Sequence, residues 1–142
     1  MAELKETAAC LQIIGDSLIP ELITTALGKP PTSAHHKGDH VPLPKGGYRI
    51  ARSGSWCIDV QRRKPGDLDG QISEILKGTS LDLEVWKELA NQFELRIFCG
   101  IFLQEFNEGL YISAATTKLL GSRCIALDLD VYSSYNDEPD SF

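Results

Sequence analysis

Two stretches of this chain resemble each other, and each follows an apolar run that is typical of a strand. Residues 17–28 (SLIPELITTALG) have a looser counterpart in residues 110–121 (LYISAATTKLLG). Each stretch has the apolar spacing of one short helix and ends at a glycine, a residue that commonly closes helices. The repetition therefore predicts two β-α-β halves in one chain.

Hydrophobic periodicity predicts the remaining elements. Strands are expected at 8–14, 55–61, 95–103 and 124–132, and helices at 20–27, 68–76, 85–93 and 114–121. Gly28 and Gly121 are expected to close the two repeat helices, and Ser113 to cap the second one. The predicted fold class is α+β: a ferredoxin-like split β-α-β sandwich with a four-stranded antiparallel sheet and both repeat helices on one face. The helical pair within residues 65–93 is predicted to be an insertion between the halves.

Length and charge limit the class of protein. At 142 residues the chain is expected to be a single domain, with a core of about residues 8–132 and an acidic C-terminal tail at 136–142. A net charge of −6 makes nucleic acid and anionic membranes poor partners. The first residues lack the apolar core of a signal peptide, and no apolar run approaches the ~20 residues of a membrane span. A cytoplasmic protein is expected.

A long loop is expected at residues 32–47, which are polar and rich in proline and glycine, and 48–52 form a candidate edge strand. The loop carries a cluster of titratable residues: His35, His36, Lys37, Asp39 and His40. Two imidazoles and a carboxylate are ligands for zinc or nickel, but adjacent histidines in an extended segment point in opposite directions. A solvated loop that contacts a ligand is favoured over a metal site, and no cofactor is expected.

The tetrapeptide Gly15-Asp16-Ser17-Leu18 spells the signature of the GDSL-type esterases, and it lies between a predicted strand and a predicted helix. A serine nucleophile requires a histidine base. Those esterases supply the base from a D-x-x-H segment near the C-terminus, and this chain has no such segment. The tetrapeptide is therefore predicted to be a turn in which Asp16 or Ser17 bonds exposed helix N–H groups.

Strand parity places a mixed set of side chains on the sheet face opposite the repeat helices. The set comprises Gln12, Asp59, Gln61, Arg96, Phe98, Phe102, Asp128, Asp130 and Tyr132. Its aspartates would repel phosphates, so RNA binding is rejected. Exposed Phe98 and Phe102 would be costly, so a cover is expected, and the inserted helix around Trp86 is favoured over a second copy of the chain.

The candidate binding residues combine this face with the loop and the turn, and none of them is assigned a catalytic role. They are Asp16, Ser17, His35, His36, Lys37, Asp39, Trp56, Asp59, Phe98, Phe102, Asp128, Asp130 and Tyr132.

The four cysteines fall about one to each predicted strand. Parity places Cys99 in the core, and it places Cys10, Cys57 and Cys124 on the opposite face. Small buried thiols are favoured over a metal or redox cluster, because free cysteine packs as a small apolar residue.

Several short motifs occur in order along the chain. They are Gly15-Asp16-Ser17-Leu18, Leu27-Gly28, Pro31-Thr32-Ser33, Lys37-Gly38-Asp39, Gly54-Ser55-Trp56 and Leu129-Asp130-Val131-Tyr132. With these motifs, over roughly residues 8–132, the chain resembles a bacterial family known as domain-of-unknown-function family four-two-seven-nine. The resemblance implies a small single-domain bacterial protein and carries no catalytic residues.

A non-catalytic binding domain is the first functional hypothesis. Small acidic bacterial domains without a catalytic set often act as inhibitors or immunity partners of basic effector proteins, because opposite charge speeds encounter. The alternative is a small-ligand-binding protein or hydrolytic enzyme that uses the 32–47 loop beside Asp16 and Ser17. A third hypothesis is a ligand-sensing module that forms a homodimer through the open sheet face.

Overall fold

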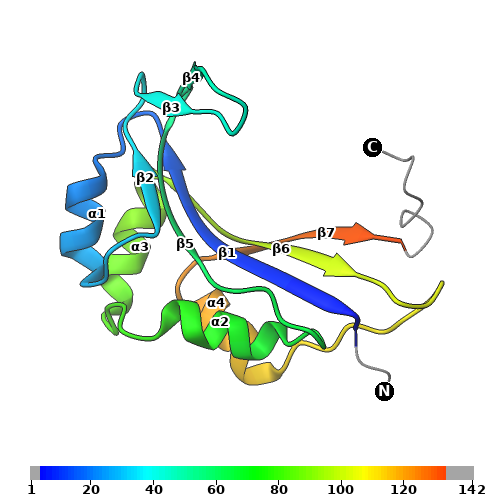
Figure 1. Ribbon diagram of the computed structural model, residues 1–142. Helices are drawn as coiled ribbons and strands as arrows, with labels where there is room; N and C mark the ends of the chain where they lie inside the picture. The colour runs from blue at the N-terminus through cyan, green and yellow to red at the C-terminus, as the bar shows by residue number, and fades with distance from the viewer. Residues whose placement is uncertain (1–3, 134–142) are drawn as a thin grey trace.

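A bent five-stranded sheet with helices on one side forms the framework of the computed structural model, which describes residues 4–133 (Figure 1). In spatial order the strands are β2 (Ser33–His35), β5 (Gly54–Asp59), β1 (Glu6–Gly15), β6 (Glu94–Phe102) and β7 (Ala126–Tyr132). The helices are α1 (Pro20–Leu27), α2 (Leu68–Leu76), α3 (Leu83–Gln92) and α4 (Ala114–Ser122). A separate hairpin pairs β3 (His40–Pro42) with β4 (Tyr48–Ile50). The predicted α+β class is confirmed.

The strand order differs from the predicted ferredoxin-like arrangement. β1 lies between β5 and β6 and is antiparallel to both, whereas β6 and β7 are parallel neighbours. In a split β-α-β half the two strands are parallel and another strand lies between them, and neither half here has that form. The prediction of a purely antiparallel sheet is wrong, because side-chain alternation identifies the faces of a strand and not its neighbours.

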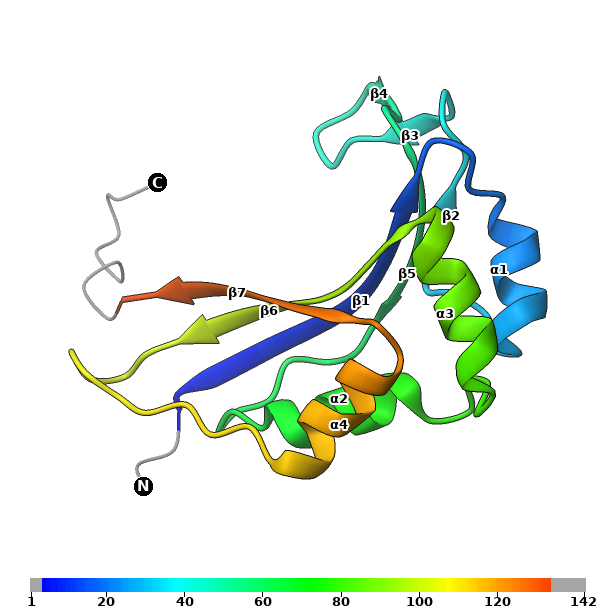
Figure 2. The ribbon, with the colours of Figure 1, turned by 180° about the vertical axis from the view of Figure 1, so that it is seen from behind.

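All four helices lie on the convex side of the sheet, and the opposite side is concave (Figures 1 and 2). Leu11 of β1 and Ile97 of β6 point to the helices and are fully buried. Ile23 from α1 and Leu120 from α4 belong to the same core cluster as these strand residues. The prediction that both repeat helices cover one face is therefore confirmed.

The inserted helical pair also packs on the convex side, so the prediction that it covers the opposite face is wrong. Trp86 of α3 is fully buried in the same core cluster as Ile97, and its indole N–H donates to the Ser80 carbonyl at 2.9 Å. Phe98 and Phe102 line a cavity on the concave side, and no described helix covers them. β6 carries apolar residues on both of its faces. The apolar stripe of α3 could therefore pack against either face, and the stripe alone does not indicate which one.

The ends of α1 agree with the prediction from the sequence, whereas α4 ends later than predicted. Pro20 occupies the first turn of α1, and Gly28 closes that helix in the left-handed region at φ 74°. Ser113 caps α4 with its hydroxyl, as predicted. Gly121 remains helical, however, and the left-handed residue is Cys124 at φ 59°. Cys124 thus lies in the exposed turn before β7 and not on the concave face, contrary to the prediction.

Residues 32–47 contain more regular structure than predicted. β2 extends the main sheet by pairing with β5, and β3 pairs with β4. The candidate edge strand at 48–52 therefore exists as β4, but outside the main sheet. Strands of three residues carry too little periodicity for recognition in a sequence. The predicted acidic tail at 136–142 lies outside the described residues.

Candidate functional site

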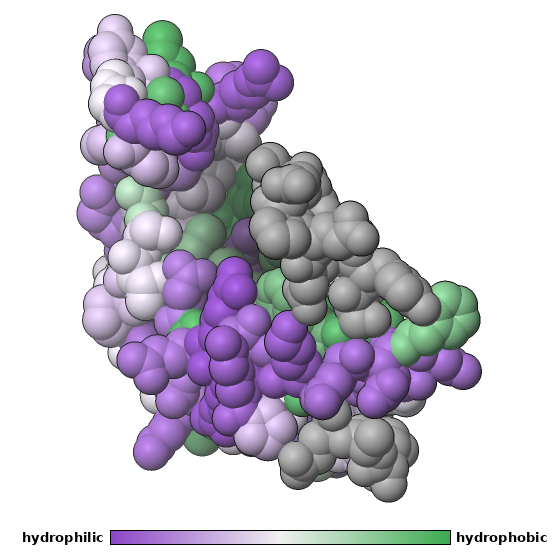
Figure 3. All heavy atoms as spheres, turned by 45° about the vertical axis from the view of Figure 1, so that its right-hand side comes forward, coloured by the Kyte–Doolittle hydropathy of each residue, from purple (hydrophilic) through white to green (hydrophobic). Residues whose placement is uncertain are grey.

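The concave face of the sheet is the surface that no described helix covers. Alternate residues of β1, β5, β6 and β7 point to it, and they share this face because paired residues on neighbouring strands point the same way. They include the predicted set Gln12, Asp59, Arg96, Phe98, Phe102, Asp128, Asp130 and Tyr132. Gln61 follows β5 and lies outside the ladder. Figure 3 shows this side of the molecule hollowed below the β3–β4 hairpin, with hydrophobic surface in the hollow.

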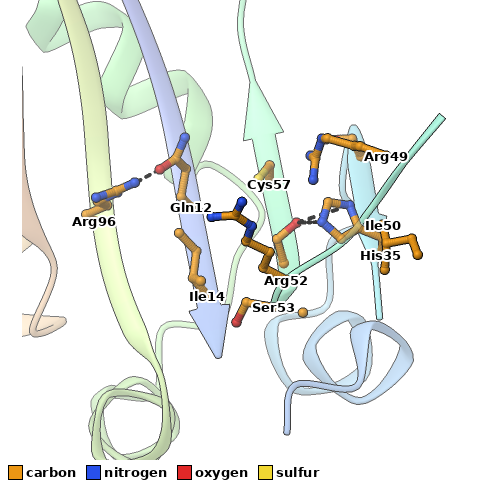
Figure 4. Close-up of a pocket in the computed structure, with 12 residues that line it drawn as sticks. Gln12, Ile14, His35, Arg49, Ile50, Arg52, Ser53, Cys57 and Arg96 are labelled. Carbon is orange, nitrogen blue, oxygen red and sulfur yellow. Dashed lines mark hydrogen bonds between the residues drawn. The ribbon is translucent and has the colours of Figure 1, made fainter. Parts of the chain in front are cut away.

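An upper cavity of about 740 Å³ lies where the concave face meets the segment after the hairpin (Figure 4). Its lining comes from β1, β2, β4, β5 and β6 and includes Gln12, Ser33, His35, Arg49, Arg52, Ser55, Cys57 and Arg96. A volume of this size is in the range of small-molecule sites.

The charge of the upper cavity is positive. Arg96 is held by Gln12 Oε1 at 2.7 Å and by Asp128 Oδ2 at 3.4 Å, so this guanidinium is fixed and partly neutralised. The side chains of Arg49 and Arg52 have no hydrogen bond or ion pair with another described residue. No carboxylate from residues 4–133 lines the cavity. Two guanidinium groups without a counter-charge in the described part of the chain therefore border a space large enough for a ligand.

Neutral polar groups form one wall of the upper cavity. The Ser55 hydroxyl lies 3.1 Å from His35 Nε2, and His35 is placed there by the pairing of β2 with β5 (Figure 4). Ser33 is paired with Cys57 across the same two strands. Hydroxyl and imidazole groups can donate or accept hydrogen bonds, so this wall is suited to a polar ligand.

Two of the cysteines meet on the concave face. The Cys10 thiol donates to the Leu11 carbonyl oxygen at 3.7 Å. The polar hydrogens of Cys10, and then of Ser55 and Ser33, near the Cys57 sulfur lower the pKa of Cys57 to about 7. The pKa of Cys10 is raised, first by the neighbouring Cys57 thiol, then by burial and the nearby Asp59 carboxylate. Cys10 and Cys57 are on the predicted face and are half-buried.

Cys99 behaves differently from this pair. It is fully buried on the helical side, as predicted, and burial together with the Asp128 charge raises its pKa to about 12.

A lower cavity of about 380 Å³ continues along the concave face toward the far ends of β6 and β7. Phe102 stacks on Tyr132 with ring centroids 4.8 Å apart, and the Arg62 guanidinium lies 5.0 Å from the Phe102 ring. The Tyr132 hydroxyl donates to Asp130 at 2.6 Å, which raises the pKa of Tyr132. This end of the face is therefore aromatic and carries carboxylates.

Asp16 joins the turn before α1 to the segments on either side of the hairpin. Its carboxylate accepts hydrogen bonds from Ser53 at 2.9 Å and Lys37 at 3.2 Å, and these contacts lower the pKa of Asp16. Gly54 is required beside them, because a Cβ there would lie 2.8 Å from the Gly15 carbonyl oxygen. Ser17 is exposed and makes no side-chain hydrogen bond to another described residue.

The other loop histidines contact different partners. His36 lies 3.3 Å from Glu21 and 3.6 Å from Asp39, and His40 stacks on Tyr48 at 4.1 Å. Within residues 4–133, no three His, Cys, Asp or Glu side chains gather in a way that could hold a metal ion.

The placement of Trp56 among the candidate binding residues is wrong. Its side chain is fully buried on the helical side, and its indole N–H donates to Thr24 Oγ1 at 3.0 Å. In contrast, sequence reasoning missed Arg49 and Arg52. A signal was present, because residues 40–58 contain Lys45, Arg49 and Arg52 and no Asp or Glu.

A family model described as Domain of unknown function (DUF4279) matches residues 4–134 of the chain. The chain belongs to this family. The resemblance identified in the sequence motifs is therefore confirmed. No curated protein and no solved structure matches this DUF4279 domain.

Three of the motifs that carry the resemblance meet in space in this DUF4279 domain. Asp16 of the first motif contacts Lys37 of another, and the backbone of Gly54 approaches Gly15. The motifs therefore build the junction between the α1 turn and the hairpin, at the edge of the upper cavity. Among the described residues, no helix has the length and apolar character needed to cross a membrane.

Proposed function

We propose that this DUF4279 domain is a non-catalytic binding domain that holds a small anionic ligand in the upper cavity. The observation that carries the proposal is the pair of guanidinium groups, Arg49 and Arg52, which have no counter-charge among the described residues. Arginine presents a planar set of donors that matches a carboxylate or phosphate group. A ligand anion would therefore supply the missing partner.

The remaining lining supports a small ligand of mixed character. Ser33, Ser55 and His35 offer hydrogen bonds on one side, and Ile14 and Ile50 offer apolar contact. A few convergent polar groups in a partly apolar concavity are typical of small-molecule sites. The cavity also uses the 32–47 segment, as the alternative hypothesis for a ligand-binding protein expects.

A hydrolytic role for Ser17 has less support than binding. A serine nucleophile needs a base in hydrogen-bond reach. Among the described residues, His35 contacts Ser55 and His36 contacts Glu21 and Asp39, so neither histidine is paired with Ser17.

The test is calorimetric titration of the purified domain with citrate and with inorganic phosphate, at low and at moderate salt. Binding should weaken as salt rises, and Arg49→Gln or Arg52→Gln should each reduce affinity about tenfold, which corresponds to roughly 1.4 kcal/mol. Arg62→Gln is the matched control, because Arg62 lies at the lower cavity. No binding by the wild type, or an equal loss in the control, would refute the anion site.

A protein partner is the second candidate, and the carboxylates of the lower face favour it. Asp128, Asp130 and Asp59 lie on this face, and the whole chain carries a net charge of −6. A basic segment of an effector protein would complement them, as an inhibitor or immunity role requires. Titration with a lysine-rich peptide should shift the amide NMR signals of β7, and Asp128→Asn/Asp130→Asn should abolish those shifts. Shifts confined to the hairpin would count against this candidate.

A further inference from the structure

The two edges of the main sheet differ in length. β2 forms one edge with three residues, whereas β7 forms the other with seven (Figure 2). Long edge strands are commonly protected by lysine, proline, a bulge or a covering segment. β7 contains neither lysine nor proline, and within residues 4–133 no strand pairs with its outer side. β7 is therefore the edge of this sheet that can accept an added strand.

The free backbone groups of this edge belong to alternate residues of β7. The Tyr132 carbonyl accepts a hydrogen bond from the Leu103 N–H at 3.0 Å, so Tyr132 directs its backbone groups toward β6. Successive residues of a strand direct these groups to opposite sides, so the other even-numbered residues of β7 also face β6. The odd-numbered residues direct their N–H and C=O groups away from the sheet. These outward residues are Leu127, Leu129 and Val131.

The same outward residues are apolar, and their side chains point to the helical side of the sheet. Leu127 packs against the core, but the cover decreases along the strand, because Leu129 is 39% exposed and Val131 is 55% exposed. An added strand with apolar side chains on that side would bury both residues further. One occupant can thus use the backbone groups and the apolar surface of the edge together.

The side chains on the concave side of β7 are acidic. Asp128 is half-buried and lies 3.4 Å from Arg96, so its charge is partly balanced. Asp130 accepts a hydrogen bond from the Tyr132 hydroxyl and has no ion pair with another described residue. Opposite charges on neighbouring strands stabilise their pairing. An added strand with cationic side chains on the concave side would therefore be favoured.

Charge disfavours a second copy of this chain as the occupant. Two β7 strands related by a twofold axis through the sheet would run antiparallel. In the central registers of that pairing, an aspartate of one copy lies opposite an aspartate of the other, because Asp128 and Asp130 flank the middle of the strand. Like charges directly opposite each other are destabilising. The edge is therefore better suited to a cationic strand than to its own copy.

We propose that β7 binds an extended segment of a partner protein as a sixth strand, and that this segment alternates lysine or arginine with aliphatic residues. Its backbone pairs with the outward groups of β7. Its cations face Asp128 and Asp130, and its aliphatic side chains cover Leu129 and Val131. In strand addition, backbone hydrogen bonds supply affinity and alternate side chains supply specificity. The choice of a basic partner rests on the second candidate function proposed above, whereas the open edge does not.

The experiment adds two synthetic peptides of equal composition to the isotope-labelled domain. One alternates lysine with valine over seven residues, and the other places four lysines before three valines. Solvent-exchange NMR follows the amide protons of β7. The alternating peptide should slow exchange at Leu127, Leu129 and Val131 at least about tenfold, because pairing removes these N–H groups from water. The amides of Asp128 and Asp130 face β6 and should change little. The second peptide should protect none of the outward amides.

Variants separate the backbone contribution from the charge. Leu129→Pro removes an outward N–H, which edge strands tolerate, and should abolish the protection, whereas Leu129→Ala keeps this N–H and should retain part of it. Slow exchange at the Asp130 amide shows that the proline variant keeps its pairing with β6. Asp128→Asn/Asp130→Asn should weaken binding of the alternating peptide about tenfold and reduce its salt dependence. Glu84→Gln/Glu88→Gln makes the same change of net charge on exposed positions of α3 and should have no effect.

Three results would overturn the proposal. If the alternating peptide binds without slowing exchange at the outward amides, strand addition fails, and a loss of binding in Asp128→Asn/Asp130→Asn would leave the acidic partner surface in place. If protection occurs but this double variant binds equally well, the basic partner fails, and the second candidate function fails with it. Slow exchange of the outward amides before any peptide is added means that the edge is already occupied. A dimer in sedimentation would then identify a second copy, and a monomer would identify residues 134–142 of the same chain.

Discussion

Thr7 and Gln71 are fully buried and are joined by two hydrogen bonds that connect β1 to α2. The Thr7 hydroxyl donates to Gln71 Oε1 at 2.6 Å, and Gln71 Nε2 donates back to the Thr7 carbonyl at 3.0 Å. The same amide group also donates to the Gln61 carbonyl at 3.0 Å, just after β5. One glutamine side chain thus joins α2 to the central strand β1 and to the segment that follows β5.

Replacing Gln71 should therefore cost more than its size suggests. Gln71→Met keeps the side-chain volume but leaves the Thr7 hydroxyl and two carbonyls without this partner. Buried polar groups that lose their partner typically cost about 1–3 kcal/mol, so we expect a loss in this range in urea unfolding. Gln92→Met is the control on the exposed end of α3 and should change stability by less than about 0.5 kcal/mol. Equal effects of both variants would contradict the role of the pair.

The two repeat glycines should respond in opposite directions to the same substitution. Gly28 has φ 74°, so Gly28→Ala places a Cβ in a strained conformation and should cost about 1 kcal/mol. Gly121 is helical, and a Cβ there meets no atom within 4 Å. Gly121→Ala should therefore stabilise the domain by about 0.5–1 kcal/mol. Thermal melts of both variants measure the difference, and destabilisation by Gly121→Ala would mean that this glycine does close the helix.

These two glycines also show how far the sequence determined the fold. The apolar spacing of each repeat identified a helix at the correct place, because burial of one face dictates that spacing. Glycine at the last position indicated where α1 ends, but α4 continues through Gly121 to Ser122 and the left-handed conformation falls three residues after Gly121, on Cys124. Local sequence signals thus predicted which helices exist more accurately than they predicted where each helix ends.

The candidate site was predictable only in part for a related reason. Period-two alternation placed Cys10, Asp59 and Phe98 on one face, because that period is a property of each strand alone. The order of the strands, the side to which α3 returns and the position of Arg49 beside the upper cavity depend on contacts between distant segments. No single-strand pattern encodes such contacts, so the cationic character of the upper cavity was missed.

Asp16 should make folding stability depend on acidic pH. Its pKa is lowered in the folded state by the hydrogen bonds from Ser53 and Lys37, so its contribution is present above the unfolded value of about 3.9. The contribution is lost as pH falls through the lower folded value. Carboxyl ¹³C NMR titration of the folded domain should show this low pKa, and Ser53→Ala or Lys37→Gln should raise it. Lys87→Gln on the exposed side of α3 should leave it unchanged.

The Ser17 hydroxyl should contribute little to the same turn. The sequence predicts that Asp16 or Ser17 bonds exposed helix N–H groups, and a capping bond typically contributes about 1 kcal/mol. However, the helix cap residue is Ile19 and no side chain caps α1. Ser17→Ala should therefore change the free energy of unfolding by less than about 0.5 kcal/mol. Activity of the wild type toward short acyl esters that disappears in Ser17→Ala would instead support the hydrolase alternative.

The two faces of β6 provide the most direct test of the open sheet surface. Ile97 points into the core and is fully buried, whereas Phe98 lies half-buried on the concave side with the Arg96 guanidinium 6.0 Å from its ring. Ile97→Ala should cost about 2–5 kcal/mol in urea unfolding. Phe98→Ala should cost clearly less, about 1 kcal/mol, because part of its ring is already in water. A covering helix would have made the phenylalanine the costlier of the two.

A second copy of the chain on the concave face would remove this difference between the two variants. In that case Phe98→Ala would destabilise the domain as much as Ile97→Ala, and the melting temperature of the wild type would rise with protein concentration. Sedimentation of the wild type would then show a dimer that Phe98→Ala dissociates. We expect instead a concentration-independent melting temperature and a monomer in both proteins, because an open concave face leaves the two cavities accessible to a ligand.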